Sequence, residues 1–408
     1  MATDQPVPGA TDQPGASATG EVDLLAANIG DDRDPYPRYH EARRASPVAP
    51  AKHLGVPVTM VFSYDVASIV LRDEETFSAR INGAWMRPLL GRTILEMDGR
   101  EHFVHRKLIG HAFRPTVVKQ WEETLIRPVA HEAIDRFAAR GDAELVREFT
   151  WQVPVRVFAQ ILGVPAIDLE RWQRWAVSLE SAAVDWDRAV AAAKEAEAYF
   201  ATVIEQRRAT PGDDVISDLV TAELDGQKLP EDLIHGFLRL LIPAGAATTY
   251  RLLGSMTLAL LEQPSRLEAV RADRSLIAKA VEESLRWEAP VQFAMREATR
   301  DTELAGVAIA EGTPVFVNLG ASNRDEARYD APDAYDLSRT GPPPHVAFGD
   351  GVHRCLGEHL ARLEAAVSLD VLLDRLPDLR LDADGRDPHV LGYAFRSPNC
   401  VPIRFSPS

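Results

Sequence analysis

The residue best suited to chemistry is a single cysteine in the stretch Phe348-Gly349-Asp350-Gly351-Val352-His353-Arg354-Cys355-Leu356-Gly357. A helical pattern begins just after it, at Glu358, so the cysteine precedes a helix N-terminus, where the dipole and free N–H groups stabilise a thiolate. Such a thiolate suits an axial ligand of haem iron. A zinc site would need several ligands at short spacing, and this stretch has one Cys and one nearby His. A simpler interpretation is a buried cysteine in a glycine-rich turn.

A second candidate lies in the middle of the longest predicted helix, residues 230–262. This helix is apolar nearly all round, which predicts a central, buried position. The segment Pro243-Ala244-Gly245-Ala246-Ala247-Thr248-Thr249 interrupts it with proline, small residues and hydroxyls. These residues predict a kink or a widened turn, against which a flat ligand could lie. The segment could equally be a notch where another helix packs.

Two pairs of charged or donor residues share helix faces. His102 and Arg106 are four apart and suit a pair of carboxylates, although such pairs more often form a solvated face. Glu283 and Arg286 are three apart and can form an ion pair, which in most proteins is a surface pair. Neither pair indicates a function by itself.

Taken in order, these motifs resemble those of the cytochrome P450 family. The cysteine stretch matches the family's haem-binding loop, Phe-Gly-x-Gly-x-His-x-Cys-x-Gly, at every fixed position. The segment from Asp98 to Pro115 resembles the propionate-binding helix, and Glu283/Arg286 resembles Glu-x-x-Arg, whose Arg also meets a later segment, expected here at 323–325. The resemblance spans residues from about 30 to 405. It implies a mainly α protein with small β-sheets, in which one helix-rich domain surrounds a buried haem.

The resemblance also implies the roles of individual residues around one haem b. Cys355 would be the proximal iron ligand, within the loop that contains Phe348 and Gly349. Oxygen would bind in the kink beside Ala244 and Gly245, with Thr248 as its hydrogen-bond donor. The haem propionates would be held by His102, Arg106, Arg296 and His353. His345 is a further candidate, for a contact with the haem edge.

One position departs from the family pattern. Ala247 stands where the oxygen-binding signature has Asp or Glu, so half of the acid–alcohol relay of protons is missing. Another acid or a chain of water molecules would have to take the place of this acid in the proton relay. Substrate contacts are expected from Ala247, Val291 and Phe395, and from a loop at 81–96. The connection near 180–187 would lie over the pocket entrance.

The composition limits which binding partners and which cellular compartment are expected. The 408 residues carry a formal charge of −16, which argues against nucleic acid. No apolar run reaches about 18 residues, the length of a membrane-spanning helix, and the N-terminus has no secretory pattern. Two cysteines fit a reducing cytosol, so we expect a cytoplasmic protein without a membrane anchor. Residues 1–20 predict a disordered tail, and 21–408 the haem domain.

The function that the resemblance implies is insertion of one oxygen atom from O2 into a small hydrophobic substrate. Two cysteines are too few for an added iron–sulfur segment, so electrons would come from a separate ferredoxin and ferredoxin reductase. Arg354 could help dock an acidic partner. Ala247 leaves open a peroxide-driven or otherwise atypical oxidation. Two functions without oxygen insertion are also open: a haem-thiolate sensor or ligand carrier, and a haem-free helical scaffold.

Patterns elsewhere predict the surrounding elements. Helices are expected at 64–71, 117–140, 149–162, 168–181 and 187–208. Strands are expected at 58–62, 290–298, 379–381, 392–395 and 401–405, with a hairpin over 307–317.

Overall fold

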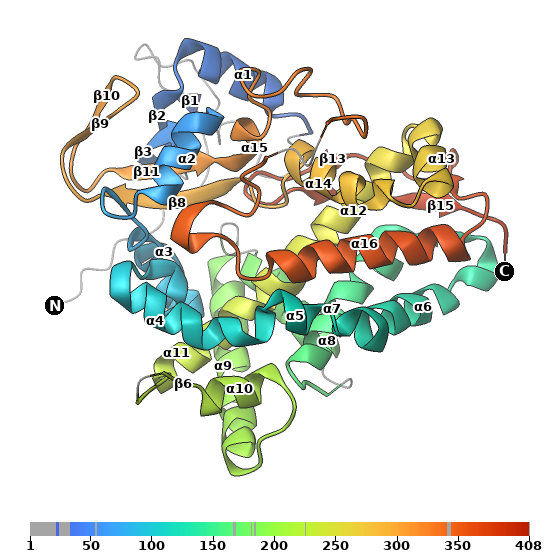
Figure 1. Ribbon diagram of the computed structural model, residues 1–408, viewed down its shortest axis with the longest axis horizontal. Helices are drawn as coiled ribbons and strands as arrows, with labels where there is room; N and C mark the ends of the chain where they lie inside the picture. The colour runs from blue at the N-terminus through green and yellow to red at the C-terminus, as the bar shows by residue number, and fades with distance from the viewer. Residues whose placement is uncertain are drawn as a thin grey trace.

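The computed structural model describes residues 22–23, 33–53, 55–165, 169–180, 182, 185–224, 226–340 and 344–407. The tail expected at 1–20 lies outside these residues, as do residues 181, 183 and 184 of the 180–187 connection. The described part is mainly helical, with small sheets, as the sequence predicts (Figure 1). In Figure 1 the largest sheet fills the upper part, and the helices α4 to α11 fill the lower part.

The helices follow one another through most of the chain. Their bounds are α1 (Tyr36–Ala45), α2 (Tyr64–Arg72), α3 (Ile81–Leu90), α4 (Gly99–Ile109), α5 (Pro115–Val118), α6 (Arg127–Asp135), α7 (Gln152–Ile161), α8 (Leu169–Glu180), α9 (Trp186–Ala209), α10 (Val215–Thr221), α11 (Glu231–Ile242), α12 (Thr248–Leu261), α13 (Pro264–Ala272), α14 (Leu276–Trp287), α15 (Leu319–Ser322) and α16 (Glu358–Arg375).

The largest sheet has six strands in the order β1-β2-β3-β11-β8-β4. They are β1 (Val22–Asp23), β2 (Val48–His53), β3 (Val56–Val61), β11 (Pro314–Asn318), β8 (Phe293–Ala298) and β4 (Phe77–Ser78). A second sheet joins β12 (Arg380–Leu381), β15 (Pro402–Arg404) and β5 (Asp142–Glu144), and three two-stranded ribbons pair β9 (Thr302–Leu304) with β10 (Val307–Ile309), β13 (Val390–Leu391) with β14 (Ser397–Pro398), and β6 (Glu223–Leu224) with β7 (Gln227–Lys228).

The central helix contains the widened turn that its sequence predicts. Helix α11 ends at Ile242, a π-helical turn η8 (Pro243–Ala247) follows, and α12 continues to Leu261. Pro243 contributes because it has no N–H to donate to the helical ladder. Nearly every side chain of α12 is buried, as the apolar pattern predicts.

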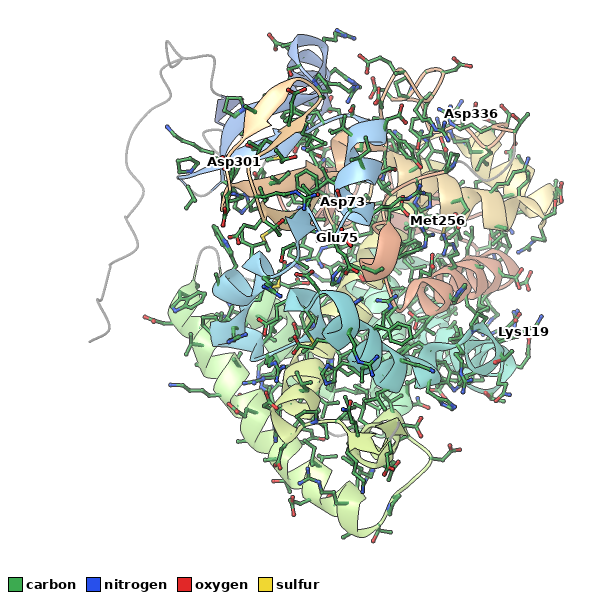
Figure 2. All side chains as sticks on the ribbon, turned by 60° about the vertical axis from the view of Figure 1, so that its left-hand side comes forward. Asp73, Glu75, Lys119, Met256, Asp301 and Asp336 are labelled. Atoms are coloured by element: carbon green, nitrogen blue, oxygen red, sulfur yellow. The ribbon has the colours of Figure 1, made fainter. Side chains whose placement is uncertain are left out.

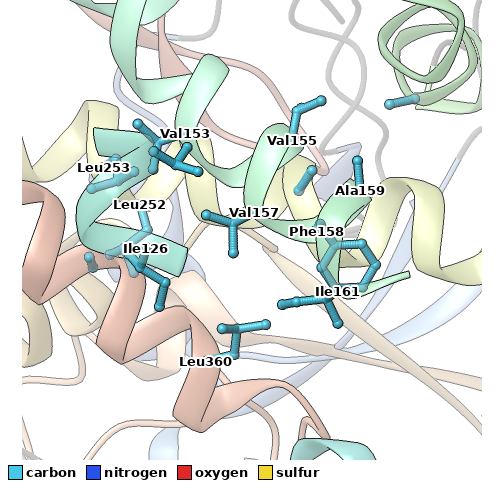
Figure 3. Close-up of a cluster of buried hydrophobic side chains, with 14 of the residues drawn as sticks. Ile126, Val153, Val155, Val157, Phe158, Ala159, Ile161, Leu252, Leu253 and Leu360 are labelled. Carbon is cyan, nitrogen blue, oxygen red and sulfur yellow. The ribbon is translucent and has the colours of Figure 1, made fainter. Parts of the chain in front are cut away.

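The main hydrophobic core is built where α7 meets α12 and α16. Figure 3 shows Val157 and Phe158 of α7 among Leu252 and Leu253 of α12 and Leu360 of α16. Each fully buried side chain of this kind contributes about 1.5–3 kcal/mol relative to an exposed one. The core therefore fixes the central helix against the helix that follows the cysteine. Charged side chains project from the outer faces, such as Asp301 on the sheet side and Lys119 on the helical side (Figure 2).

Three predictions of local structure are wrong. The loop expected at 81–96 is helix α3 followed by a short 3-10 turn, η1 (Ile94–Glu96), because tertiary contacts replace what the local pattern lacks. Arg87 pairs with the buried carboxylate of Glu96 at 2.7 Å, and the Asn82 amide donates to the carbonyl of Leu95 at 3.0 Å. These bonds hold the helix despite its glycine and proline.

The other two concern strands near the C-terminal half of the chain. The hairpin expected over 307–317 is displaced toward the N-terminus, because its turn falls at Ala305 and Gly306, both with positive φ, and joins β9 to β10. Strand β11 instead pairs with β8 and β3 in the large sheet. The strand expected at 392–395 is the turn between β13 and β14, where Gly392 has a φ of 109°.

Candidate haem site

Glycine conformations shape the loop that presents Cys355. Gly349 and Gly351 have φ values of 70° and 68°, and a Cβ on Gly351 would lie 2.6 Å from the carbonyl oxygen of Leu71. The Cys355 N–H donates to the Phe348 carbonyl at 2.8 Å, which closes the loop. Cys355 lies two residues before Gly357, the residue that caps α16. The loop thus holds the sulfur at one defined place.

The expected lowering of the Cys355 pKa is wrong for the protein by itself. Burial raises the pKa of this thiol, and the backbone N–H of Gly357 lowers it by a smaller amount. The thiol lies deep in the protein, although it is open to an internal cavity. A helix N-terminus therefore does not hold the thiolate unaided, whereas coordination to a metal ion deprotonates a thiol outright.

Cys355 faces a cavity of about 380 Å³, which lies within the usual range for small-molecule sites. Phe348, Gly349 and Val291, which were expected from the sequence to make cofactor or substrate contacts, also line it. The central helix contributes its widened turn, and most other lining side chains are apolar. Those from the central helix are Phe237, Leu240, Leu241, Ala244, Gly245, Thr248, Thr249 and Leu252.

The widened turn brings a hydroxyl to this cavity. The Thr248 Oγ1 donates a hydrogen bond to the carbonyl of Ala244 at 2.9 Å. Gly245 permits the close approach of the neighbouring helix, because a Cβ there would overlap the ring of Phe158. The turn therefore combines an accessible small-residue surface with one positioned alcohol.

Four nitrogen-bearing side chains meet at one end of the same cavity: His102, Arg106, Arg296 and His353. The rings of His102 and His353 are 4.0 Å apart between centroids. Burial lowers the pKa of His102 to about 3 and that of Arg296 to about 10, so the arginine stays charged at neutral pH. Among the described residues, the Nε2 atom of His102 has no hydrogen-bond partner. Buried donors without partners indicate an anionic ligand.

Sequence reasoning missed two acids beside this group. Asp98 Oδ1 lies 3.7 Å from His353 Nε2, and Glu74 offers an oxygen near both histidines. Burial alone would raise the pKa of Asp98, but its contact with His353 and its bonds with Ser78 and the Ala79 backbone lower it to about 2. The Asp-Gly pair that starts α4 was the available signal, since such residues precede helices.

Three expected contacts lie elsewhere. Ala247 and Phe395 do not line the cavity: Ala247 is fully buried, and the ring of Phe395 lies 5.0 Å from the guanidinium of Arg251. His345 does not line the cavity either, because its Nε2 bonds the carboxylate of Glu282 at 3.2 Å. Position along the chain could not show which way these side chains point.

The Glu283/Arg286 pair is buried and joins three segments. Arg286 Nη2 lies 2.7 Å from Glu283, and its Nη1 donates to the carbonyl of Asn323 at 3.1 Å, in the segment expected from the sequence. Arg339 also bonds Glu283, at 3.0 Å. Arg286 is 0% exposed. The pair therefore fixes the chain that leads into the cysteine loop.

Comparisons with known proteins agree with this arrangement. The family model for cytochrome P450 matches residues 183–377. The putative cytochrome P450 YjiB of Bacillus subtilis is 37% identical over 87% of this chain and 91% of its own length. The solved structure of cytochrome P450 CYP109Q5 from Chondromyces apiculatus is 34% identical and has a TM-score of 0.86, covering 95% of this chain and 99% of that one. The structure of P450BioI in complex with a hexadec-9Z-enoic acid ligated acyl carrier protein is 31% identical, with a TM-score of 0.84, covering 91% and 98%.

The chain belongs to the cytochrome P450 family and has its fold. It is an oxidoreductase whose family carries haem, acts on an organic substrate with O2, and receives electrons from redox partners. The cavity fits haem, because it offers one thiol, an apolar lining and unpartnered nitrogen donors together. In the part of the chain that the structure describes, no helix has the length and apolar character needed to cross a membrane.

Proposed function

We propose that this protein is a haem-thiolate monooxygenase that inserts one oxygen atom from O2 into a small hydrophobic substrate. The observation that carries the proposal is the cavity in which Cys355 and the Thr248 turn face a shared apolar space. When bound there, haem supplies activation of O2, and a thiolate ligand favours O–O cleavage. The protein supplies the ligand, the position of the substrate and the exclusion of water.

Haem b is the proposed form, with Cys355 as its iron ligand and residues 21–408 as one haem domain. Its two propionates would be held by His102, Arg106, Arg296 and His353, which line one end of the cavity. Arg106 also donates to the carbonyl of Arg354 and so joins α4 to the cysteine loop. Phe348, Gly349, Ala244 and Gly245 would contact the flat faces of the group.

Thr248 is the proposed catalytic residue. Its hydroxyl sits on the turn that lines the cavity and is held through Ala244. Its single hydroxyl proton would turn from the Ala244 carbonyl to donate a hydrogen bond to dioxygen there. The substrate would lie against Val291 and the apolar side chains of α3, α11 and β8, including Met86, Phe237 and Phe293.

Electrons are proposed to come from a separate ferredoxin and its reductase, in the cytoplasm. The two cysteines are both unpaired, which supports a reducing compartment. Arg354 already bonds Glu358 at 2.7 Å, so its charge is partly neutralised as a docking group. P450BioI, a similar protein, has been solved with an acyl carrier protein, so carrier-bound acyl chains belong in the substrate screen.

The first test is the difference spectrum of the reduced protein with carbon monoxide. We expect a strongly red-shifted Soret band, which Cys355→His abolishes while haem is retained. Addition of ferredoxin, its reductase and a screened hydrophobic compound should then stimulate NADH consumption with formation of a hydroxylated product. A colourless protein, or a band typical of histidine-ligated haem in the wild type, would contradict the proposal.

A second candidate function is peroxide-driven oxidation, favoured by Ala247 in place of the relay acid. It predicts product formation from hydrogen peroxide at rates that rival the ferredoxin route. The comparison needs one substrate and both oxidant systems. Absence of product with peroxide alone would rule it out.

A further inference from the structure

A buried ion pair lies directly behind the widened turn. Arg251 of α12 makes a bidentate contact with Glu180, the last residue of α8, at 2.8 and 2.7 Å. The two side chains are 8% and 11% exposed. Paired charges so well buried are strongly coupled, because water screens them little. The pair connects two helices whose paired residues are 71 apart in the sequence.

The same arginine also braces the turn. Its Nη1 donates to the carbonyl of Ala247 at 2.9 Å, while Thr248 donates to the carbonyl of Ala244. Both carbonyls belong to the π-helical turn η8, whose backbone departs from α-helical bonding. The two side chains therefore hold different parts of the segment that faces the cavity.

Arg251 also contacts the C-terminal turn between β13 and β14. Its guanidinium lies 5.0 Å from the ring of Phe395, which suits a cation–π interaction. Phe395 in turn forms an isolated backbone bridge with Val291, and Val291 lines the cavity. Through these partners Arg251 is connected to α8, to the turn η8 and to the cavity wall at Val291.

We propose that Arg251, held by Glu180, is a positioning residue that fixes the oxygen-side turn carrying Thr248. The inference rests on the proposed haem site, because it concerns a turn that lines the same cavity as Cys355. The proposal also explains why residue 247 is an alanine and not an acid. A carboxylate at 247 would lie four residues before Arg251 on one helix face and would compete with Glu180 for the guanidinium. In this chain the acid that pairs with the arginine comes from α8 instead.

The test uses the ferrous carbon monoxide complex of the holoenzyme, which needs no knowledge of the substrate. The C–O stretching band reports the surroundings of the turn, and rebinding after photolysis reports access to the iron. Glu180→Gln should broaden or shift the band and accelerate rebinding by at least about fivefold, the lower end of typical coupling between sites. Arg251→Lys, which keeps the charge but loses the bidentate geometry, should act in the same direction.

Glu195→Gln is the matched control. Glu195 of α9 forms an ion pair with Arg171 of α8 at 3.4 Å, and both side chains are about half exposed. Glu195→Gln therefore makes the same Glu-to-Gln change in a surface ion pair that involves α8, and it leaves the turn untouched. It should keep the wild-type band and rate. Wild-type behaviour of both Glu180→Gln and Arg251→Lys, with the red-shifted Soret band intact, would overturn this inference and leave the proposed function standing. Absence of that band in the wild type overturns both.

Ala247→Glu provides a second, independent test of the Arg251–Glu180 pair. We expect it to draw Arg251 away from Glu180 and to accelerate rebinding as Glu180→Gln does. Combining Ala247→Glu with Glu180→Gln should then add little to either single change, because both substitutions act on one interaction. Additive effects of the two substitutions would contradict the shared pair.

Discussion

At the scale of single residues, the site depends on small side chains as much as on reactive ones. Gly245 lets Phe158 approach the turn that carries Thr248, and Gly351 lets the cysteine loop pass the backbone of Leu71. The sequence left two interpretations of the small residues of the turn open: room for a flat ligand, or a notch where another helix packs. The structure shows that Gly245 is also required by protein packing.

Gly245→Ala should therefore destabilise the protein. The new Cβ would overlap the Phe158 ring, which is 2% exposed, so the ring would have to shift toward the cavity that it lines. We expect a loss of about 1–3 kcal/mol in the free energy of unfolding, more than the gain in helix propensity offsets. Urea unfolding measures it.

Gly254→Ala, nine residues further along on α12, is the comparison, since the nearest atom to its Cβ would belong to Pro398, at 3.1 Å. Gly254→Ala should lower the free energy of unfolding by less than Gly245→Ala does. Phe158→Leu should restore part of the stability lost in Gly245→Ala. Equal stability of Gly245→Ala and the wild type would show that the ring moves freely.

At the scale of elements, one buried arginine connects α14 to the long segment before the cysteine loop. Arg286 donates to the carbonyls of Asn323, Pro332 and Ala334, at 3.1, 2.7 and 2.8 Å, besides pairing with Glu283. Such a residue organises irregular backbone that has no sheet or helix of its own. Its effect on the haem site is indirect, through the placement of that segment.

Arg286→Met should leave the Glu283 carboxylate buried, with Arg339 as its one remaining ionic partner among the residues that the structure describes. We expect a loss of about 3–5 kcal/mol in the free energy of unfolding, together with weaker haem retention. Denaturant unfolding and haem content give the two values. Arg208→Met breaks a pair of the same spacing at the surface, Arg208–Glu205, and should cost no more than about 1 kcal/mol. Similar losses in both variants would refute a special role for the buried pair.

At the scale of the whole molecule, pH should act through a buried histidine before it acts through carboxylates. His53 lies among aromatic rings, 4.7 Å from Phe316 between centroids, and burial lowers its pKa to about 4. The unfolded chain binds a proton at this site below about pH 6.5, whereas the folded protein binds it only below about pH 4. The pKa values of Asp98, Glu282 and Glu326 are about 2, so their stabilisation is lost only below about pH 4.5.

Stability should therefore fall as pH drops from about 6.5 toward 4, with His53 contributing at most about 3 kcal/mol. His53→Phe keeps an aromatic ring but loses the bond to the Tyr393 hydroxyl, and it should reduce the pH dependence in this window. Part of the slope should remain, because burial also lowers the pKa of His102, to about 3. Unfolding free energies at several pH values measure the slope. The exposed His359 offers a control, because His359→Gln should leave the slope as it is. An unchanged slope in His53→Phe would contradict the assignment.

The sequence by itself determined the family resemblance, the cysteine loop, the helix face of His102 and Arg106, and the widened turn before Thr248. These are local patterns, in which spacing along the chain fixes neighbours on a helix or in a tight loop. It could not show that α3 is a helix, since Glu96 and Asn82 hold it through contacts outside its own pattern.

Only the tertiary structure decided which distant side chains meet. The Arg251–Glu180 pair joins residues 71 apart, and the placement of Ala247 and Phe395 outside the cavity depends on how α12 is rotated against α8 and the C-terminal turn. The same holds for the Cys355 pKa, which burial raises although the local pattern predicts the reverse. Burial and electrostatic coupling are properties of packed surroundings, and no spacing of residues along one segment contains them.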